Sequence, residues 1–179
     1  MPARSPTHWY EEAELVRAKP TPDGQARTRA NNVTAFLDMI AHAEGTPRYG
    51  KEMGYNVLVG GELFDSYADH PRRLVRLPAY GISSTAAGRY QFLESTWDEL
   101  AARLNLIDFK PARQDEAAVE LIRQRQALSL VHEGRIRDAI QACRTVWASL
   151  PGAGYGQREL KADELLAVYR NAGGTLAPA

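Results

Sequence analysis

An apolar stripe of helical spacing near the start of the chain constrains the fold more than any other feature. Its members recur at intervals of three and four residues: Val33, Phe36, Leu37, Ile40 and Ala41. This spacing is typical of an amphipathic helix that packs one face into a core. Asn32 is a suitable N-cap and Gly45 a suitable stop. We therefore expect a largely buried helix that begins at Asn32 and ends just before Gly45.

The last turn of this helix carries Glu44, the main candidate for chemistry. Glu44 follows Ile40 by about one helical turn, so it continues the apolar face. Burial and the negative end of a helix dipole both favour the protonated form of a carboxyl group. A carboxylic acid that stays protonated near neutral pH can be the general acid that glycosidic bond cleavage requires. From position alone, a Glu that reaches solvent at a frayed helix end is an equally good interpretation.

The remaining patterns predict a mainly helical α+β fold with one small sheet. Residues 55–64 place a Gly-Gly turn between two apolar runs, which is typical of a β-hairpin. Beyond Gly88 the apolar spacing is mostly helical. We expect four helices there. The first begins at a capping box formed by Ser95 and Asp98, and the second follows Pro111. The third runs from Ile136 to Leu150, and the last stops at Gly173-Gly174.

Two regions of different composition divide the chain. Residues 1–31 contain Pro2, Pro6, Pro20 and Pro22 among many charged residues. We expect this N-terminal extension to be disordered or to hold a short helix. Residues 32–179 have the length and apolar content of one ordinary domain, which we expect to carry the function.

Charge and residue counts exclude several classes of partner. The 22 basic and 22 acidic residues give no net field toward nucleic acid or a membrane surface. Cys143, the single cysteine, lies in an apolar helical pattern and is expected in the core. The four histidines lack the spacing of metal ligands, so we expect no metal and no cofactor. We find neither an apolar run that could span a bilayer nor a signal peptide.

Two further segments have residues suited to a sugar ligand. The run Ser84-Thr-Ala-Ala-Gly-Arg-Tyr-Gln91 combines small residues with hydroxyl, phenol and amide groups. The glycine-rich loop 151–157 carries Tyr155 and Gln157, and an aromatic ring on such a loop can pack on a sugar ring. Each segment alone is a weak indication, because glycine-rich turns with a tyrosine also occur in plain loops.

Five motifs together carry a resemblance to a known family. They are Ala43-Glu-Gly-Thr46, Val59-Gly-Gly-Glu-Leu-Phe64, Asp69-His-Pro-Arg72, Ala87-Gly-Arg-Tyr-Gln91 and Trp147-Ala-Ser-Leu-Pro-Gly-Ala-Gly-Tyr-Gly-Gln157. In this order they resemble the lambda lysozyme family of lytic transglycosylases, which are phage endolysins. The resemblance runs from about Asn32 to Thr175 and does not cover the N-terminal extension.

The resemblance implies a lysozyme-like fold that cleaves peptidoglycan glycan strands. In this family one glutamate moves the protons, and its motif matches Glu44. The hairpin at 55–64 and the loop at 151–157 match two lip loops that border a substrate cleft. The substrate-binding residues implied by these motifs are Val59, Gly60, Ser84, Thr85, Tyr90, Gln91, Gly154, Tyr155 and Gln157. The expected product is a 1,6-anhydro-N-acetylmuramic acid end, formed without water.

Other functions remain open at this point. A hydrolytic lysozyme would need a second carboxylate, and Asp65 and Asp69 are the candidates; turn chemistry explains both aspartates better. His42 and His70 suggest a peptidase, but no Gly-x-Ser-x-Gly or His-Glu-x-x-His motif accompanies them. A non-catalytic protein that binds peptidoglycan, or a structural part of a virion, is a weaker alternative.

The resemblance also implies a biological setting. We expect a monomer that accumulates in the host cytoplasm and needs a holin to reach periplasmic peptidoglycan. This expectation combines the family resemblance with the lack of a recognisable export signal.

Overall fold

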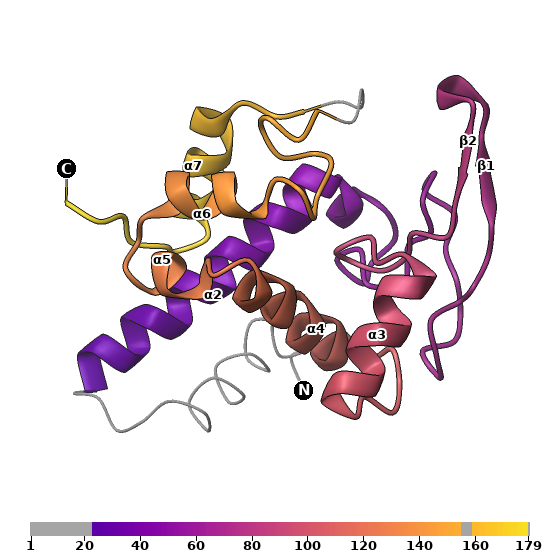
Figure 1. Cartoon of the computed structure of the whole chain (residues 1–179), viewed down its shortest axis with the longest axis horizontal. Helices are drawn as coiled ribbons and strands as arrows, with labels where there is room; N and C mark the ends of the chain where they lie inside the picture. The colour runs from indigo at the N-terminus through magenta and orange to yellow at the C-terminus, as the bar shows by residue number, and fades with distance from the viewer. Residues whose placement is uncertain (1–22, 155–158, 179) are drawn as a thin grey trace. The chain divides into compact units, whose positions relative to one another are not determined.

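The helix expected from the apolar stripe is the longest element of the computed structural model, which describes residues 23–154 and 159–178 (Figure 1). This helix, α2, spans Asp23–Glu44. It ends as predicted, because Gly45 takes a left-handed backbone conformation with φ of 72°. The predicted start at Asn32 was wrong. Asn32 lies inside α2 and is buried, and the polar turns before it form a helix without any apolar repeat.

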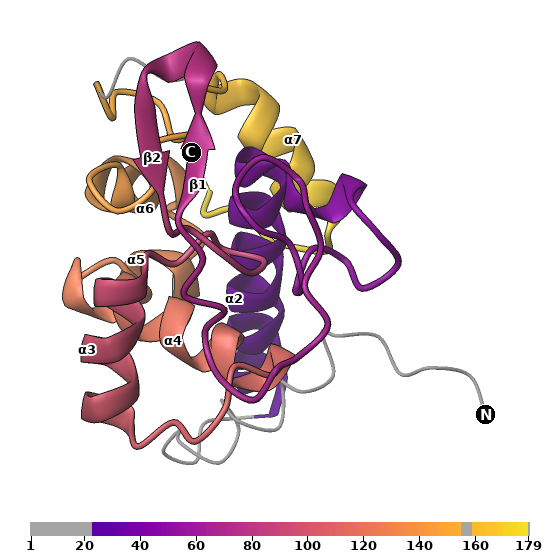
Figure 2. The ribbon, with the colours of Figure 1, turned by 90° about the vertical axis from the view of Figure 1, so that its right-hand side faces the viewer.

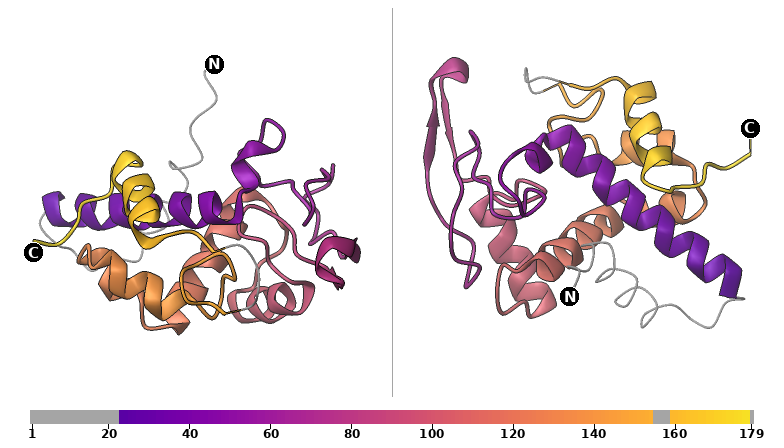
Figure 3. Two further views of the ribbon diagram at one scale, coloured as in Figure 1. Left: turned by 90° about the horizontal axis from the view of Figure 1, so that it is seen from above. Right: turned by 180° about the vertical axis from the view of Figure 1, so that it is seen from behind.

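The chain divides into two compact units, of which unit 1 contains Met1–Ala43 and Ala118–Ala179. Beside α2 it holds α5 (Leu128–His132), α6 (Ile136–Cys143) and α7 (Ala162–Asn171). The short helix α5 packs on α6, and α6 packs on α7. Figure 3 shows α7 against α2, where His42 Nε2 lies 3.9 Å from Glu164 Oε1. Cys143 is fully buried, which confirms its predicted core position, and burial raises the pKa of its thiol to about 12.

The chain after α7 returns across unit 1 and is held by a buried asparagine. Asn32 Nδ2 donates to the His132 carbonyl at 3.3 Å, and Asn32 Oδ1 accepts the Thr175 N–H at 2.8 Å. Two residues further on, the Ala177 N–H donates to the Gly134 carbonyl at 3.0 Å. Residues 175–177 therefore connect α2 to the turn that follows α5.

The return of the chain over Gly134 makes this glycine sensitive to substitution. A Cβ at Gly134 would overlap the Thr175 carbonyl oxygen and lie 2.6 Å from Ala177 N, at a φ of +74°. We expect Gly134→Ala to lower the free energy of unfolding by about 3 kcal/mol or more, because backbone strain and overlap add. Gly173→Ala is the control: its φ is +92°, but no atom lies within 4 Å of the new Cβ. Urea denaturation should show the larger loss for Gly134→Ala, and equal losses would contradict this prediction.

Unit 2 is the continuous segment Glu44–Ala117. Its elements in order are η1 (Thr46–Arg48), β1 (Val75–Leu77), η2 (Pro78–Tyr80), β2 (Ile82–Ser84) and α3 (Glu94–Leu104), followed by the start of α4 (Pro111–Gln124). Strands β1 and β2 pair antiparallel with Val75 opposite Ser84, as the hairpin in Figure 2 shows. Edge-to-face aromatic contacts fill the core of this unit, the shortest between Trp97 and Phe109 at 4.6 Å between centroids.

The small sheet was predicted in part, and the start of α3 was predicted wrongly. Residues 55–64 do turn back at Gly60-Gly61 as predicted: Val57 and Leu63 form an antiparallel bridge, and the Leu58 N–H donates to the Glu62 carbonyl at 2.7 Å. The segment is too short in its pairing to form a full strand, and Leu58 also bridges to Ala87. The two-stranded sheet lies at 75–84, where Pro78 sits at the tip of hairpin β1–β2 and interrupts no ladder bond. The predicted capping box at Ser95 and Asp98 is not formed. α3 begins at Glu94, so Ser95 lies within its first turn, and the helix has no side-chain cap on its N-cap residue.

One of the later helices is shorter than predicted, and another begins where predicted. The helix expected at Ile136–Leu150 ends at Cys143, and turns occupy much of the segment that follows. The helix expected after Pro111 begins with that proline, which suits a first helical position because it lacks an N–H. Among the residues that the structure describes, no helix combines the length and the apolar character needed to cross a membrane.

Candidate active site

Glu44 is the last residue of α2 and is followed by a tightly fixed turn. It is half-buried, whereas Phe36 and Ile40 earlier in the helix are fully buried. Two residues beyond Glu44, Thr46 is buried, and its Oγ1 donates to the Arg89 carbonyl at 2.7 Å. Gly54 packs so closely on Thr46 that a Cβ there would lie 2.7 Å from the Thr46 backbone. The turn after Glu44 is thus anchored to the segment 87–91.

A buried polar cluster lies beneath this anchor. Asp115 Oδ1 accepts hydrogen bonds from Tyr55 Oη at 2.8 Å and from Tyr90 Oη at 2.6 Å. Burial, and then the charge of Asp115, raise the pKa of both phenols, so the two hydroxyls remain donors. The Arg89 guanidinium lies 5.2 Å from the centre of the Tyr55 ring and donates to the Met53 carbonyl. This cluster fixes the position of Arg89, whose carbonyl holds Thr46.

Gln114 joins the same segment to the first turn of α4. Its Oε1 accepts the Arg89 N–H at 2.9 Å, while its Nε2 donates to the carbonyls of Tyr55 at 3.0 Å and Phe109 at 2.8 Å. Gly88 sits directly on this amide, with a φ of +80°, and a Cβ there would overlap Gln114 Oε1. The glycine of the Ala87–Gln91 motif is therefore required by close approach and by backbone conformation.

Five of the predicted substrate-binding residues come together in unit 2. The Val59 N–H donates to the Ala86 carbonyl at 2.8 Å, which places Val59 and Gly60 beside the end of β2. Ser84 ends β2 and Thr85 follows it. Gln91 lies at the other end of the motif, where its Nε2 donates to the Gly88 carbonyl at 2.9 Å. Gly60 is exposed, and the other four are half-buried.

Three of the predicted substrate-binding side chains, those of Tyr90, Thr85 and Ser84, already have hydrogen-bond partners within unit 2. Tyr90 is only 1% exposed, and its hydroxyl is bound to Asp115. Thr85 Oγ1 accepts the Glu94 N–H at 3.1 Å, and Ser84 Oγ accepts the Ala86 N–H at 3.2 Å. The structure therefore gives Tyr90 a supporting position inside unit 2, and it gives Thr85 a link to α3.

The glycine-rich loop belongs to unit 1, and Glu159 closes it. Tyr155 and Gln157 lie outside the described residues. Glu159 Oε1 accepts the Gly154 N–H and Glu159 Oε2 accepts the Gly152 N–H, each at 2.8 Å. These backbone hydrogen bonds, that from Gly154 first, lower the pKa of Glu159. The carboxylate therefore joins the two sides of the segment that contains the predicted lip residues.

The Glu159 contact gives a pH-dependent prediction. Because its pKa is lower when the contact forms, the stabilisation is fully present above the ordinary glutamate pKa and is lost as the pH falls through the lowered value. We expect the Gly152 and Gly154 amides to exchange with solvent faster at acidic pH. Amide exchange measured by NMR across this range checks the prediction. In Glu159→Ala the exchange rates, corrected for intrinsic pH dependence, should be high throughout; protection that survives this change would contradict it.

The alternative catalytic groups are placed in structural roles or on the surface. Asp69 Oδ1 accepts the His70 N–H at 2.7 Å, and Asp69 Oδ2 is 2.9 Å from Arg72 Nε. His70 is buried with its Nε2 2.9 Å from the Phe92 carbonyl, and burial lowers the pKa of its ring. His42 is exposed near Glu164, and Asp65 is exposed.

Sequence reasoning missed the groups that support Glu44. Gln114 and Asp115 are the polar members of a buried helical face that continues with Ala118 and Ile122. A polar residue within an apolar helical repeat was the signal that singled out Glu44, and the same signal would have found these two. Nothing in the local sequence indicates that Thr46 reaches Arg89, because the two residues are 43 positions apart.

Comparison with known proteins gives consistent matches. The Endolysin family matches residues 34–176. The endolysin of Escherichia phage lambda is 51% identical over 149 residues, which cover 82% of this chain and 94% of that protein. The endolysin of Escherichia phage P2 is 47% identical over 157 residues, which cover 82% of this chain and 95% of that protein.

Solved structures match the fold. Bacteriophage lambda lysozyme complexed with a chitohexasaccharide superposes with a TM-score of 0.79 at 51% identity, over 82% of this chain and 96% of that one. A second structure, lysozyme from bacteriophage lambda, gives a TM-score of 0.75 at 50% identity, over 82% and 96% of the two chains. The mainly helical fold with a small antiparallel sheet is therefore lysozyme-like, as the sequence motifs implied.

Proposed function

Because this chain belongs to the endolysin family, we propose that it cuts peptidoglycan by lytic transglycosylation. The bond cleaved is the β-1,4 bond between N-acetylmuramic acid and N-acetylglucosamine. Family membership supports a lysozyme-type enzyme that acts on peptidoglycan. The finer assignment to a transglycosylase rests on the carboxylates of this chain.

In the proposed reaction Glu44 acts first as acid and then as base. Its carboxyl proton passes to the glycosidic oxygen as the bond from that oxygen to C1 of muramic acid breaks. The resulting carboxylate then accepts the proton of the muramic 6-hydroxyl, whose oxygen forms a new bond to C1. The products are a free 4-hydroxyl on the leaving sugar and a 1,6-anhydro end. No water is consumed, and Glu44 finishes in its starting form.

The engagement of Asp69 is the observation that carries this scheme. A hydrolytic lysozyme commonly uses a second carboxylate as nucleophile or as base for water. Asp69 is bound to Arg72 and to the His70 N–H. Although partial burial opposes it, the hydrogen bond from Arg72 lowers the pKa of Asp69. Asp69 thus has a structural partner for each oxygen, which leaves Glu44 as the proposed proton carrier.

We assign glycan contacts to the predicted residues whose surface remains accessible. Val59, Gly60, Ser84 and Gln91 lie together in unit 2. Gly154 is a further proposed contact that rests on the sequence motif alone. Tyr155 and Gln157 remain proposed contacts from the sequence. The chitohexasaccharide complex of lambda lysozyme supports a glycan as the ligand. Tyr90, which is hydrogen-bonded to Asp115, and Thr85, which is hydrogen-bonded to the Glu94 N–H of α3, hold these residues in place.

Product analysis tests the reaction type. Purified peptidoglycan is digested, and the muropeptides are weighed before and after borohydride treatment. We expect products that are one water lighter than hydrolytic ones and that borohydride does not reduce. Reducible ends would overturn the transglycosylase proposal and indicate a hydrolytic lysozyme that uses Asp65 or Asp69 with Glu44. Binding without any product would indicate a non-catalytic glycan-binding protein.

We also propose that the protein accumulates in the cytoplasm of a host cell as a monomer and reaches the periplasmic wall through a holin. Phage endolysins among the relatives support this setting. Expression with and without a co-expressed holin tests it. Lysis should follow only when the holin is present. Rapid lysis by the protein alone would overturn the proposal.

A further inference from the structure

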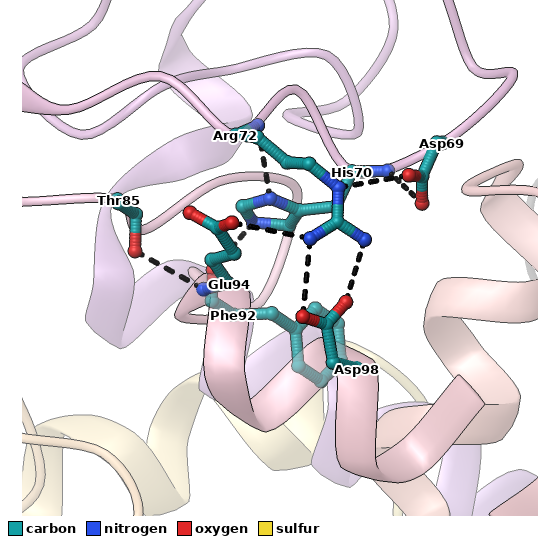
Figure 4. A network of polar contacts seen from close by, with 7 residues as sticks. All are labelled: Asp69, His70, Arg72, Thr85, Phe92, Glu94 and Asp98. Carbon is teal, nitrogen blue, oxygen red and sulfur yellow. Dashed lines mark hydrogen bonds and ion pairs between the residues drawn. The ribbon is translucent and has the colours of Figure 1, made fainter. Parts of the chain in front are cut away.

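The side chain of Arg72 binds the first end of hairpin β1–β2 to α3 (Figure 4). Arg72 precedes β1 by three residues. Its Nη2 lies 2.5 Å from Asp98 Oδ1, and its Nη1 lies 3.1 Å from Asp98 Oδ2. The same Nη1 is 3.2 Å from Glu94 Oε1. A two-pronged guanidinium–carboxylate pair of this kind fixes direction as well as distance.

The second end of the hairpin is bound to the same turn of α3. Thr85 directly follows β2, and its Oγ1 accepts the Glu94 N–H at 3.1 Å. The first N–H groups of a helix lack partners within it, and the N-cap residue of α3, Leu93, provides no side-chain cap. The Thr85 hydroxyl supplies the missing acceptor from the end of β2. Glu94 therefore contacts both ends of the hairpin, one with its carboxylate and one with its backbone.

The backbone at Arg72 is strained and is held from several sides. Its φ is +53°, a conformation that residues other than glycine adopt at an energetic cost. The Arg72 N–H donates to His70 Nδ1 at 3.1 Å, and the opposite ring nitrogen of His70 lies 2.9 Å from the Phe92 carbonyl. Asp69 contacts Arg72 Nε from a third side. Such strain persists only where the surroundings determine it, and this often occurs next to functional segments.

The hairpin itself has little to hold it in place. Its two strands pair over three residues each, and Tyr80 and Ile82 are 57% and 45% exposed. A two-stranded hairpin alone is marginally stable in water. Its inner side lies next to Gly60, where a Cβ would be 3.7 Å from Leu77 Cδ2. Any shift of the hairpin would therefore move Ser84 of β2 and the surface beside Gly60.

We propose that Arg72 is a positioning residue that holds hairpin β1–β2, including the glycan-binding residue Ser84 in β2, beside the glycan-binding residue Gly60. This inference deepens the proposed function and rests on it for the identity of the ligand. Arg72 itself is not required to touch the glycan. Its effect on the reaction passes through the placement of the hairpin, so substrate binding should suffer more than the chemical step.

A spin label at the hairpin tip measures placement without reference to activity. Tyr80→Cys introduces an accessible thiol, while the native Cys143 is buried and stays unlabelled. The label is read by electron paramagnetic resonance in four backgrounds: wild type, Arg72→Ala, Asp98→Asn and Arg103→Ala. Asp98→Asn is the milder variant in case Arg72→Ala does not fold. Arg103→Ala is the matched control, because it breaks the exposed Arg103–Glu99 pair within α3.

We expect a more mobile label in Arg72→Ala and Asp98→Asn and an unchanged one in Arg103→Ala. On wall fragments, Arg72→Ala should raise KM by about five- to tenfold while kcat changes by less than about twofold. An unchanged label in a folded Arg72→Ala protein would overturn the positioning role, whatever the enzyme's products are. A mobile label with unaltered KM would also overturn it, since the hairpin would then not serve binding. Reducible products in the wild type would contradict only the proposed reaction.

Discussion

Replacing Glu44 by glutamine is expected to reduce the rate of wall cleavage by about a thousandfold. The amide has nearly the same shape as the acid but can neither give a proton to the leaving oxygen nor take one from the attacking hydroxyl. In a mechanism with one proton carrier both steps fail together. The measurement is the rate of muropeptide release from purified peptidoglycan.

The fold should survive this substitution, which makes its interpretation direct. Glu44 ends α2, and the turn after it is held by Gly45 and Thr46 rather than by the carboxylate alone. We expect a thermal midpoint within about 2 °C of the wild type, as is usual for partly exposed positions. Glu99→Gln, an exposed acid on α3, is the control and should keep full activity. Undiminished lysis by Glu44→Gln would remove Glu44 from the mechanism.

Replacing Asp115 by alanine should lower the free energy of unfolding strongly. The substitution leaves the buried hydroxyls of Tyr55 and Tyr90 without the acceptor that both share. Burial of an unsatisfied hydroxyl costs about 1 to 3 kcal/mol, so the two together predict a loss of about 3 kcal/mol or more. That loss corresponds to a fall of roughly 6 to 12 °C in Tm for a chain of this size.

Two milder variants separate hydrogen bonding from packing at this position. Asp115→Asn keeps an acceptor oxygen and should lose less than Asp115→Ala. Tyr90→Phe removes one donor and leaves the Tyr55 bond in place, at a cost of about 1 kcal/mol. Chemical denaturation of the four proteins gives the order wild type, Tyr90→Phe, Asp115→Asn, Asp115→Ala. If Asp115→Ala were as stable as Tyr90→Phe, the shared hydrogen bonds would contribute little.

The helix that ends at Glu44 was predictable because its information is local. The spacing of Phe36 and Ile40 and the glycine at 45 each act within one or two helical turns. The start of α2 was not predictable in the same way, since the turns before Asn32 carry no apolar repeat and their helix extends from the packed part. Mainly local information also placed Cys143 in the core.

The sheet and the supports of the site depend on pairings between distant segments. The apolar run at 57–58 is buried and pairs locally with 62–63 as expected, but Leu58 also bridges to Ala87, which lies 29 positions further along the chain. Hairpin β1–β2 was not predicted; Pro78 lies at its tip, where a proline removes no ladder bond. The links from Thr46 to Arg89 and from Gln114 to Arg89 join motifs whose order is visible in the sequence but whose contacts are not.

The division of the chain into a continuous and a discontinuous unit has a consequence for folding during synthesis. Every residue of unit 2, Glu44–Ala117, is synthesised and leaves the ribosome ahead of α5, α6 and α7. Unit 1 cannot close until Thr175 reaches Asn32, a contact between residues 143 positions apart. Contacts of such long separation form slowly, and domains fold as units in the order of their synthesis. Helix α2, which ends at the candidate acid, is therefore made early and packed last, so its apolar face is the surface most exposed to aggregation while the chain is being completed.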